Sequence, residues 1–342
     1  MNNTIINIYI TFDYELFLGP KTGSVENCLL IPTDKLIYIA KKHNVHFVFF
    51  VDVLYIAKMR EYIDIVPSLK SDYNKVMTQL KKLKKEGHDL QLHLHPQWYY
   101  SSYDVKSESW NMDFEHYKLS DCSYKDIEIM INEGSKIIQS LTDVNPIAFR
   151  AGGFSFPIDV SIINLFSKYN IFKDSSALMF EEKKTCFQTY DYSRISEFNS
   201  YKFKENILEE NANGVFIEYP ISCIRIFGLY KSIIERLLRF FQKKNLFISG
   251  DGKGIGYVMN MHNSENKNIN IRNLMQKKII RASFDANNGY WVNKIKNTIR
   301  KNKQSLMVIY GHPKNMTNYS YKKLDSFLDN LTEKDCISIF NE

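Results

Sequence analysis

The sequence predicts an α/β protein of the β/α-barrel type, and three observations predict it. Short apolar runs rich in β-branched and aromatic residues recur along the chain, helical patterns lie between most of them, and charged or titratable residues follow the ends of the runs. Strands that alternate with helices form parallel βαβ units. In a barrel the carboxyl ends of the strands converge on one face, whereas an open sheet spreads them along a crevice. The polar strand ends therefore favour the barrel.

The chain contains seven strand candidates. In order they are 5–13, 45–52, 89–95, 146–153, 170–176, 214–222 and 305–313. The clearest helical patterns between them are 33–43, 74–87 and 124–141. The first of these helices begins on polar capping residues after Pro32, and the second ends at Gly87. About seven parallel strands are thus expected in one domain that spans residues 1–342.

Segment 223–300 interrupts the alternation and predicts a long helical insertion before the last strand. Within it, residues 231–245 (KSIIERLLRFFQKKN) repeat apolar pairs at helical spacing and carry basic residues on the other face. We expect this helix to pack on the barrel. The alternative is a helix that makes peripheral contact with a membrane surface or binds a partner.

Composition limits the class of protein further. The chain has 342 residues with 44% hydrophobic content, enough for one large core, and its net charge of +7 is spread along the sequence as solvated lysines. No nucleic-acid partner is expected from so diffuse a charge. Five cysteines without a C-x-x-C pair exclude a disulfide framework and predict a cytoplasmic protein. No signal peptide and no membrane-spanning run are expected, and the oligomeric state stays open.

The stretch DLQLHLHPQWYY places His93 and His95 one residue apart at the end of an apolar run. Side chains two residues apart share one face of a strand, and so do Asp13 and Glu15 if the first strand extends that far. Two imidazoles and a carboxylate supply three ligands for a divalent metal such as zinc and leave a position for water. The competing interpretations are a filled strand that happens to contain imidazoles, and a strand-end Asp that caps a loop.

Three further strand ends carry candidate residues. Arg150 could orient a carboxylate or stabilise a developing oxyanion, and the alternative is a structural ion pair. His312 suits a general acid, although a lone histidine is often structural. Asp174 could hydrogen-bond and orient a catalytic His or Arg, with a helix cap as the alternative. The order of these residues along the strands, rather than any one of them, indicates an active site.

In the order of the chain, the segments TFDYELFLG, HDLQLHLHPQW, FRAGGFS, KDSS, EYPIS and GHPK resemble the polysaccharide deacetylase-like proteins of the NodB-homology or carbohydrate esterase family 4 superfamily. The sequence is most similar to a divergent branch found with surface-polysaccharide genes. The resemblance covers most of the chain. It implies a distorted, incomplete β/α barrel that removes acetyl groups from N-acetylated sugars with metal-activated water, and hence a carbohydrate substrate.

The resemblance also implies roles for the residues of the first strand. Asp13 matches the family's catalytic base, but Tyr14 stands where the family has its metal-binding Asp. Glu15 is the available substitute, so either Asp13 or Glu15 would be the ligand.

Of the remaining motifs, one differs from the family pattern in its spacing and two match it at the key residue. The family's two metal-binding histidines lie one helical turn apart, whereas His93 and His95 are separated by a single residue. Arg150 matches the arginine of the third motif, and His312 matches the histidine that protonates the leaving amine.

Three rival functions remain. The first is a catalytically altered barrel that binds a sugar or nucleotide-sugar without hydrolysis, with an aromatic wall of Trp98, Tyr99, Tyr100 and Trp110. The second is an amidohydrolase-type barrel, which would carry its H-x-H on the first strand, where this chain has acids. The third is a nucleotide-binding protein that uses the glycine-rich segment 249–259, whose spacing does not match a phosphate-binding loop.

Overall fold

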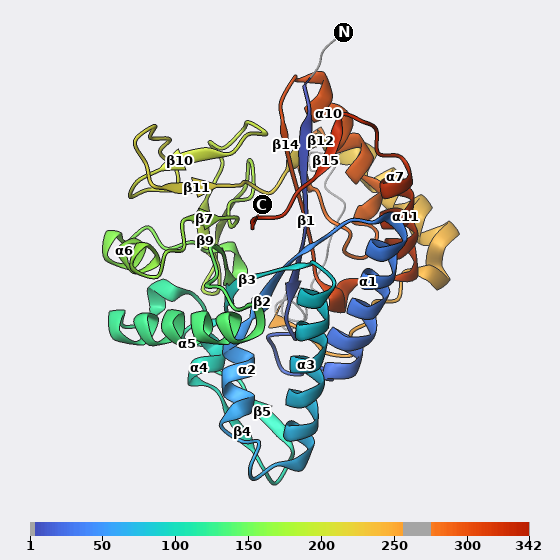
Figure 1. The fold of residues 1–342 in the computed structure, drawn as a ribbon. Helices are drawn as coiled ribbons and strands as arrows, with labels where there is room; N and C mark the ends of the chain where they lie inside the picture. Colours follow the sequence, from blue (N-terminus) through green and yellow to red (C-terminus); the bar gives the residue numbers. More distant parts are fainter. Residues whose placement is uncertain (1–3, 256–274, 342) are drawn as a thin grey trace.

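The centre of the protein is one curled sheet of nine strands (Figure 1). The computed structural model describes residues 4–255 and 275–341. Along the sheet the order is β10-β11-β7-β6-β3-β2-β1-β14, and β15 (Asp335–Ile337) also pairs with β1. No pairing in the described residues joins β10 (Tyr201–Phe203) to β14, so the barrel is open and incomplete.

Seven strands of this sheet run parallel along its path, and they coincide with the seven apolar runs of the sequence. They are β1 (Ile6–Tyr14), β2 (Val48–Asp52), β3 (Asp89–Leu94), β6 (Ala148–Ala151), β7 (Lys173–Asp174), β11 (Phe216–Glu218) and β14 (Leu306–Gly311). The predicted fold class is confirmed. The antiparallel edge strand β10 and the parallel strand β15 are additions that the sequence did not indicate.

Helices cover the outer side of the curled sheet. They are α1 (Ile31–His43), α2 (Val53–Arg60), α3 (Pro67–Lys85), α4 (Pro96–Tyr100), α5 (Tyr124–Thr142), α6 (Val160–Lys168), α10 (Val292–Lys301) and α11 (Asn318–Asp329). Within this layer α11 packs on α1, and α5 packs on α2, α3 and α6. The predicted helices 33–43, 74–87 and 124–141 correspond to α1, α3 and α5.

The segment before the last strand is helical in α7 (Gly228–Gln242) and α10, as expected, and it also contains a pair of strands. These are β12 (Cys223–Phe227) and β13 (Lys277–Arg281), which pair antiparallel. In β12 the side chains of Ile224 and Ile226 are buried, whereas those of Arg225 and Phe227 are exposed. This alternation is the period-two pattern of a strand, and it accounts for the departure from an all-helical insertion.

The alternation of side chains along β1 separates two apolar cores. One face of β1 carries Ile6, Ile8, Ile10 and Phe12, which join the main core. The opposite face carries Tyr9, Thr11 and Asp13 toward the inside of the curled sheet. Tyr9 packs against a small second cluster of Val48, Phe50, Ala148 and Phe340. The inner face of β1 therefore changes from aromatic at its start to charged at its carboxyl end.

Phe340 closes the aromatic end of the barrel. Its ring is 5.0 Å from that of Tyr9, 5.8 Å from that of Phe50 and 5.1 Å from that of Tyr219, measured between centroids. Its backbone N–H donates to a carboxylate oxygen of Asp89 at 2.8 Å. The C-terminal segment thus fills the end of the barrel opposite the charged strand ends.

We predict that Phe340→Ala lowers the free energy of unfolding by about 3–5 kcal/mol, because it leaves a cavity among three aromatic rings. Urea denaturation followed by circular dichroism measures the change. Phe247→Ala is the matched control: its side chain is 75% exposed, and its effect should stay within about 0.5 kcal/mol. Equal effects of the two substitutions would show that Phe340 contributes no buried packing.

Candidate active site and metal centre

The carboxyl end of β1 supplies two carboxylates to the inside of the curled sheet. Asp13 and Glu15 lie on the same side of the chain, and both are buried. Tyr14 lies between them on the other side, where its hydroxyl donates to the side-chain oxygen of Gln79 at 2.9 Å. Tyr14 is therefore directed away from the site, and Glu15 supplies the second acid.

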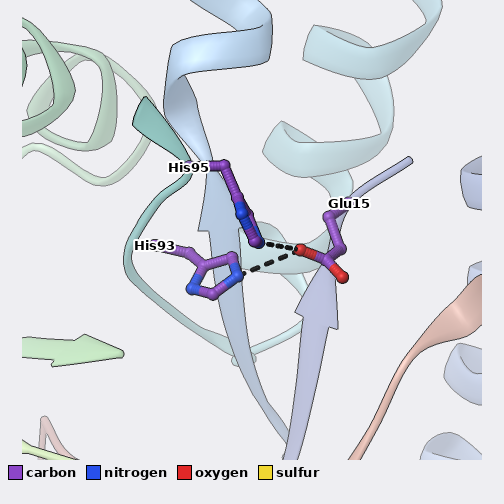
Figure 2. A group of neighbouring side chains, drawn as sticks. All are labelled: Glu15, His93 and His95. Atoms are coloured by element: carbon purple, nitrogen blue, oxygen red, sulfur yellow. Dashed lines mark hydrogen bonds and ion pairs between the residues drawn. The ribbon is translucent and has the colours of Figure 1, made fainter. Parts of the chain in front are cut away.

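Glu15, His93 and His95 form a buried cluster (Figure 2). The same carboxylate oxygen of Glu15 lies 3.1 Å from Nε2 of His93 and 2.5 Å from Nε2 of His95. Nδ1 of His93 is 2.7 Å from the carbonyl oxygen of Arg150, which fixes that ring. Gly152 allows the close approach of His95, because a Cβ at Gly152 would lie 2.7 Å from Nδ1 of His95. The two histidines of the H-x-H motif thus share one face, as the sequence predicts.

Lys314 holds the other oxygen of Glu15. Its ammonium group donates to that oxygen at 2.7 Å and to the carbonyl of Leu16 at 2.5 Å. Burial alone would raise the pKa of Glu15, but the charges of Lys314 and His95 and the hydrogen bonds from both histidines hold that pKa well below its usual range. Glu15 is therefore a carboxylate at neutral pH, and its position is fixed from two directions.

Asp13 pairs with Arg150 instead of joining the histidine cluster. One guanidinium nitrogen of Arg150 lies 2.6 Å from a carboxylate oxygen of Asp13. The same guanidinium donates to the carbonyl and the hydroxyl of Ser175 and lies over the ring of Phe50. Since Arg150 is fully buried and makes several hydrogen bonds, it fixes the orientation of Asp13.

His312 closes the site from β14. Its Nδ1 lies 2.6 Å from a carboxylate oxygen of Asp285, and its backbone N–H donates to the other oxygen at 2.7 Å. Nε2 faces the acids, 3.5 Å from Glu15 and 3.7 Å from Asp13. Burial lowers the pKa of His312, but Asp285, Glu15 and Asp13 outweigh it and raise that pKa above its ordinary value. These acids therefore favour the protonated form of the imidazole, which is the form that can donate a proton.

Sequence reasoning missed Asp285 and Lys314 as site residues. Asp285 is the last residue of the run KKIIRASFD. The first two strand runs of the sequence also end in Asp. That signal was present, but it lies inside the segment assigned to the insertion. Lys314 is the last residue of the segment GHPK, but no role was predicted for it. Its role depends on Glu15, which lies 299 residues away in the sequence.

Asp174 does not make the contact predicted for it, the orientation of a catalytic His or Arg. Its carboxylate accepts from the backbone N–H of Ser176 at 2.9 Å and from the Ser176 hydroxyl at 2.8 Å. The neighbouring Ser175 hydrogen-bonds Arg150, and Asp285 holds His312. Side chains alternate along β7, so the residue next to Asp174 faces the site. Asp174 is thus hydrogen-bonded to Ser176 and to the side chain of Glu218.

Asp52 is a second buried carboxylate near the histidines. It ends β2, where it pairs in register with His93. Both of its oxygens lack a hydrogen-bond partner within the described part of the chain, as does Nδ1 of His95. Burial raises the pKa of Asp52 to about 6, although the two histidines act to lower it. An unpaired carboxylate at this depth increases the negative potential around His93 and His95.

The site opens into a cavity of about 270 Å³. Its floor holds the predicted residues Asp13, Glu15, His93, His95 and His312, together with Lys314. Its walls are formed by Phe17, Tyr117, Phe154, Phe187 and Gln188, and by Gly254 and Ile255. A larger depression of about 690 Å³ at α1 and α11 is lined by none of the site residues.

The aromatic wall proposed for a sugar-binding barrel is not at this cavity. Trp98 is fully buried, with its ring 4.7 Å from Tyr55 and 5.2 Å from Trp110. The hydroxyls of Tyr99 and Tyr100 donate to Asp126. These side chains therefore hold α4 and the β4–β5 hairpin (Ser102–Asp104 and Ser109–Asn111) against Tyr55 of α2 and Asp126 of α5.

The glycine-rich segment 249–259 is described only as far as residue 255. Its described part lies along the cavity: Gly250 donates its backbone N–H to the carbonyl of Lys314, and Ile255 donates to that of Leu18. Residues 256–259 lie outside the described part of the chain. The segment thus contributes a wall of the cavity.

Part of the chain matches a known family, and its fold resembles that of a solved structure. The family model described as "Polysaccharide deacetylase" matches residues 2–170. A crystal structure of a protein from Mycobacterium smegmatis, described as a polysaccharide deacetylase, aligns with a TM-score of 0.52 and 12% identity, and the alignment covers 99% of this chain and 88% of that one. No curated protein sequence matches the chain.

Two other solved structures align over about half of the chain. A family 4 carbohydrate esterase from Streptomyces lividans in complex with acetate aligns with a TM-score of 0.29 and 14% identity, covering 51% of this chain and 63% of that one. A family 4 acetyl xylan esterase from Clostridium thermocellum in complex with a cobalt ion aligns with a TM-score of 0.27 and 17% identity, covering 46% and 53%.

We predict that His93 of the metal-free protein titrates near pH 9. Burial opposes protonation, but the hydrogen bond to Glu15 and the charges of Asp13, Glu15 and Asp52 raise the pKa of His93 to about 9. Imidazole NMR of 15N-labelled protein measures the midpoint, and Glu15→Gln should move it to lower pH. His88 is the internal control, since burial lowers its pKa to about 4. A midpoint for His93 below the ordinary histidine value would contradict the assigned charges.

Proposed function

We propose that the chain deacetylates an N-acetylated sugar of a polysaccharide or its precursor, because the family model described as "Polysaccharide deacetylase" matches its residues 2–170. One observation carries the proposal. The carboxylate of Glu15 meets the imidazoles of His93 and His95 beside a second acid, Asp13, and the partly buried His312, all in one cavity.

The donor set supports a divalent metal at Glu15, His93 and His95. Two imidazole nitrogens and one carboxylate oxygen lie within 4.8 Å of one another, and this ligand set suits zinc while leaving a position open. Nδ1 of His95 and both oxygens of Asp52 are buried without a hydrogen-bond partner in the described residues. A cation bound at the histidines would interact favourably with the Asp52 carboxylate. A bound dication would polarise the acyl carbonyl and lower the pKa of an attacking water.

Of the two acids, we assign metal binding to Glu15 and general-base catalysis to Asp13. Glu15 contacts both histidines, whereas Asp13 is held by Arg150. The second oxygen of Asp13 faces His312 at 3.7 Å and is available to accept a proton. The substitution of Tyr14 for the family's metal-binding Asp is thus offset by the next residue on the correct side of the strand.

The remaining residues complete the chemistry. Asp13 takes a proton from the water that attacks the amide carbonyl, and Arg150 keeps Asp13 oriented. His312, protonated and held by Asp285, gives its proton to the leaving nitrogen as the carbon–nitrogen bond breaks. The products are acetate and a sugar amine. Lys314 keeps the Glu15 carboxylate in place throughout.

The cellular setting is part of the same proposal. All five cysteines are free, which fits a reducing compartment such as the cytoplasm. We propose that the substrate is a precursor of a surface polysaccharide, which is what the resemblance of the sequence motifs to a branch found with surface-polysaccharide genes implies.

We predict that Glu15→Gln and Asp13→Asn separate the two acids. Glu15→Gln should lower metal affinity by more than about 100-fold, beyond the loss typical of an outer-shell partner. Asp13→Asn should retain the metal and lose about 10²- to 10⁴-fold in kcat. Equilibrium dialysis with zinc and a deacetylation assay measure the two effects.

Glu205→Gln, at an exposed carboxylate outside the cavity and outside both groups of possible metal ligands, is the control and should change neither quantity. The opposite pattern, with metal lost in Asp13→Asn and kept in Glu15→Gln, would reverse the assignment. Full metal occupancy together with unchanged hydrolysis in His95→Ala would exclude the metal site, and a protein without hydrolysis at any metal loading would favour the sugar-binding alternative.

We predict that Asp285→Asn moves the alkaline limb of the pH–rate profile to lower pH. The charge and hydrogen bond of Asp285 raise the pKa of His312, so their removal makes the general acid lose its proton at a lower pH. His312→Ala should lower kcat by about 10²- to 10⁴-fold. A profile of kcat against pH measures both, and an unchanged alkaline limb in Asp285→Asn would contradict the role of His312.

A further inference from the structure

Helix α7 presents an apolar face to solvent. Only Gly228 of this helix is buried, and none of the helices in 4–255 and 275–341 is long and apolar enough to cross a membrane. We define the α7 face by the exposed side chains that recur at three- and four-residue spacing on one side of the helix, namely Leu229, Ile233, Leu237, Phe240 and Phe241. The expected packing of this helix on the barrel is limited to the other side, where Ile234 contacts the main core.

The exposure of the α7 face is largest at its aromatic end. The side chains of Phe240 and Phe241 are 78% and 70% exposed, and Phe247 in the following turn is 75% exposed. Exposed phenylalanines of this size cost free energy in water and mark an interaction surface when they form one patch. The apolar patch continues through Ile248, which is also exposed.

Positive charge surrounds the α7 face. Between residues 228 and 248 the chain has five basic residues and one acidic residue. Arg236, Arg239, Lys243 and Lys244 are exposed, and the single acid Glu235 is already paired with Lys231 at 3.0 Å. An apolar helix face bordered by Lys and Arg, with Phe and Leu at its centre, is the pattern of a helix that lies in a membrane interface.

We propose that α7 and the turn after it, residues 228–248, dock on the surface of an anionic phospholipid bilayer. The apolar face would enter the boundary between headgroups and acyl chains, and the arginines and lysines would contact lipid phosphates. Pairing with a second copy of this chain is less favourable. A twofold interface would bring the arginines that border one face close to the same arginines on the other.

The segment that follows the α7 face leads to a wall of the cavity, so docking would affect access to the site. Immediately after Phe247 and Ile248, Ser249 donates its backbone N–H to Met316 and Gly250 donates to Lys314. Ile255, seven residues after Ile248, lines the cavity. The bilayer would therefore lie close to the entrance of the site. This last step rests on the proposed function, whereas the docking itself does not.

The test is cosedimentation of the full-length protein with vesicles of phosphatidylcholine alone and of phosphatidylcholine mixed with phosphatidylglycerol. The wild-type chain should bind the mixed vesicles and bind neutral vesicles much more weakly. The double variant Phe240→Ser/Phe241→Ser should lower binding at least about tenfold, because two large apolar side chains are lost. Arg236→Gln and Arg239→Gln should each lower binding roughly fivefold, and added salt should weaken it further.

Tyr38→Ser is the matched control, since this side chain on α1 is 72% exposed and lies outside the α7 face; it should leave vesicle binding unchanged. Thermal melts and hydrolysis of a soluble acetylated substrate should be unchanged in every α7 variant, which shows that these variants fold. Absence of wild-type binding to mixed vesicles, or equal binding by the double phenylalanine variant, would overturn the proposal. So would sedimentation that shows a dimer dissociated by the same variant without any change in vesicle binding. A chain that binds vesicles but hydrolyses no acetylated sugar would leave docking intact and remove only the proposed function.

Discussion

The carboxylate of Glu15 is the constraint on which the site depends. One of its oxygens lies between two imidazoles of the H-x-H motif, and the other accepts from Lys314. A buried charge is costly unless it is paired and hydrogen-bonded, so these contacts require the ends of β1 and β3 and the turn after β14 to stay in register. Arg150 extends the same constraint to β6, since its carbonyl holds His93 and its guanidinium holds Asp13.

The inside of the barrel is arranged in layers along β1. Tyr9 lies in an aromatic layer with Phe340, Thr11 donates to the backbone of β14 at 2.9 Å, and Asp13 begins the charged layer. The aromatic layer excludes water from below, which strengthens the electrostatic interactions above it. Packing at one end of the sheet and chemistry at the other are therefore carried by alternate residues of a single strand.

Local pattern predicted most of the fold, because each parallel strand is a short apolar run with its own boundary signals. It could not predict β10 or β15, since each is defined by its pairing with another strand, β11 or β1, and not by an apolar run identified in the sequence. In the site, strand periodicity was sufficient to place Asp13 with Glu15 and His93 with His95. It was not sufficient at β7, which spans two residues, because the hydrogen bonds to Arg150 come from the next residue, Ser175. Lys314 required the tertiary structure, since its partner Glu15 is 299 residues away. Asp285 was missed because the run that it ends lies inside the segment assigned to the insertion.

The distance in sequence between Glu15 and Lys314 also determines when the site can exist during synthesis. Residues 2–170, which the family model matches, contain both histidines, Arg150 and the two acids of β1. A nascent chain that has reached β13 still lacks Asp285, His312 and Lys314. Contacts between such distant residues form late, because the intervening chain must first be ordered. The reactive groups are therefore brought together only when β14 pairs with β1, after the chain has been made at least as far as Lys314.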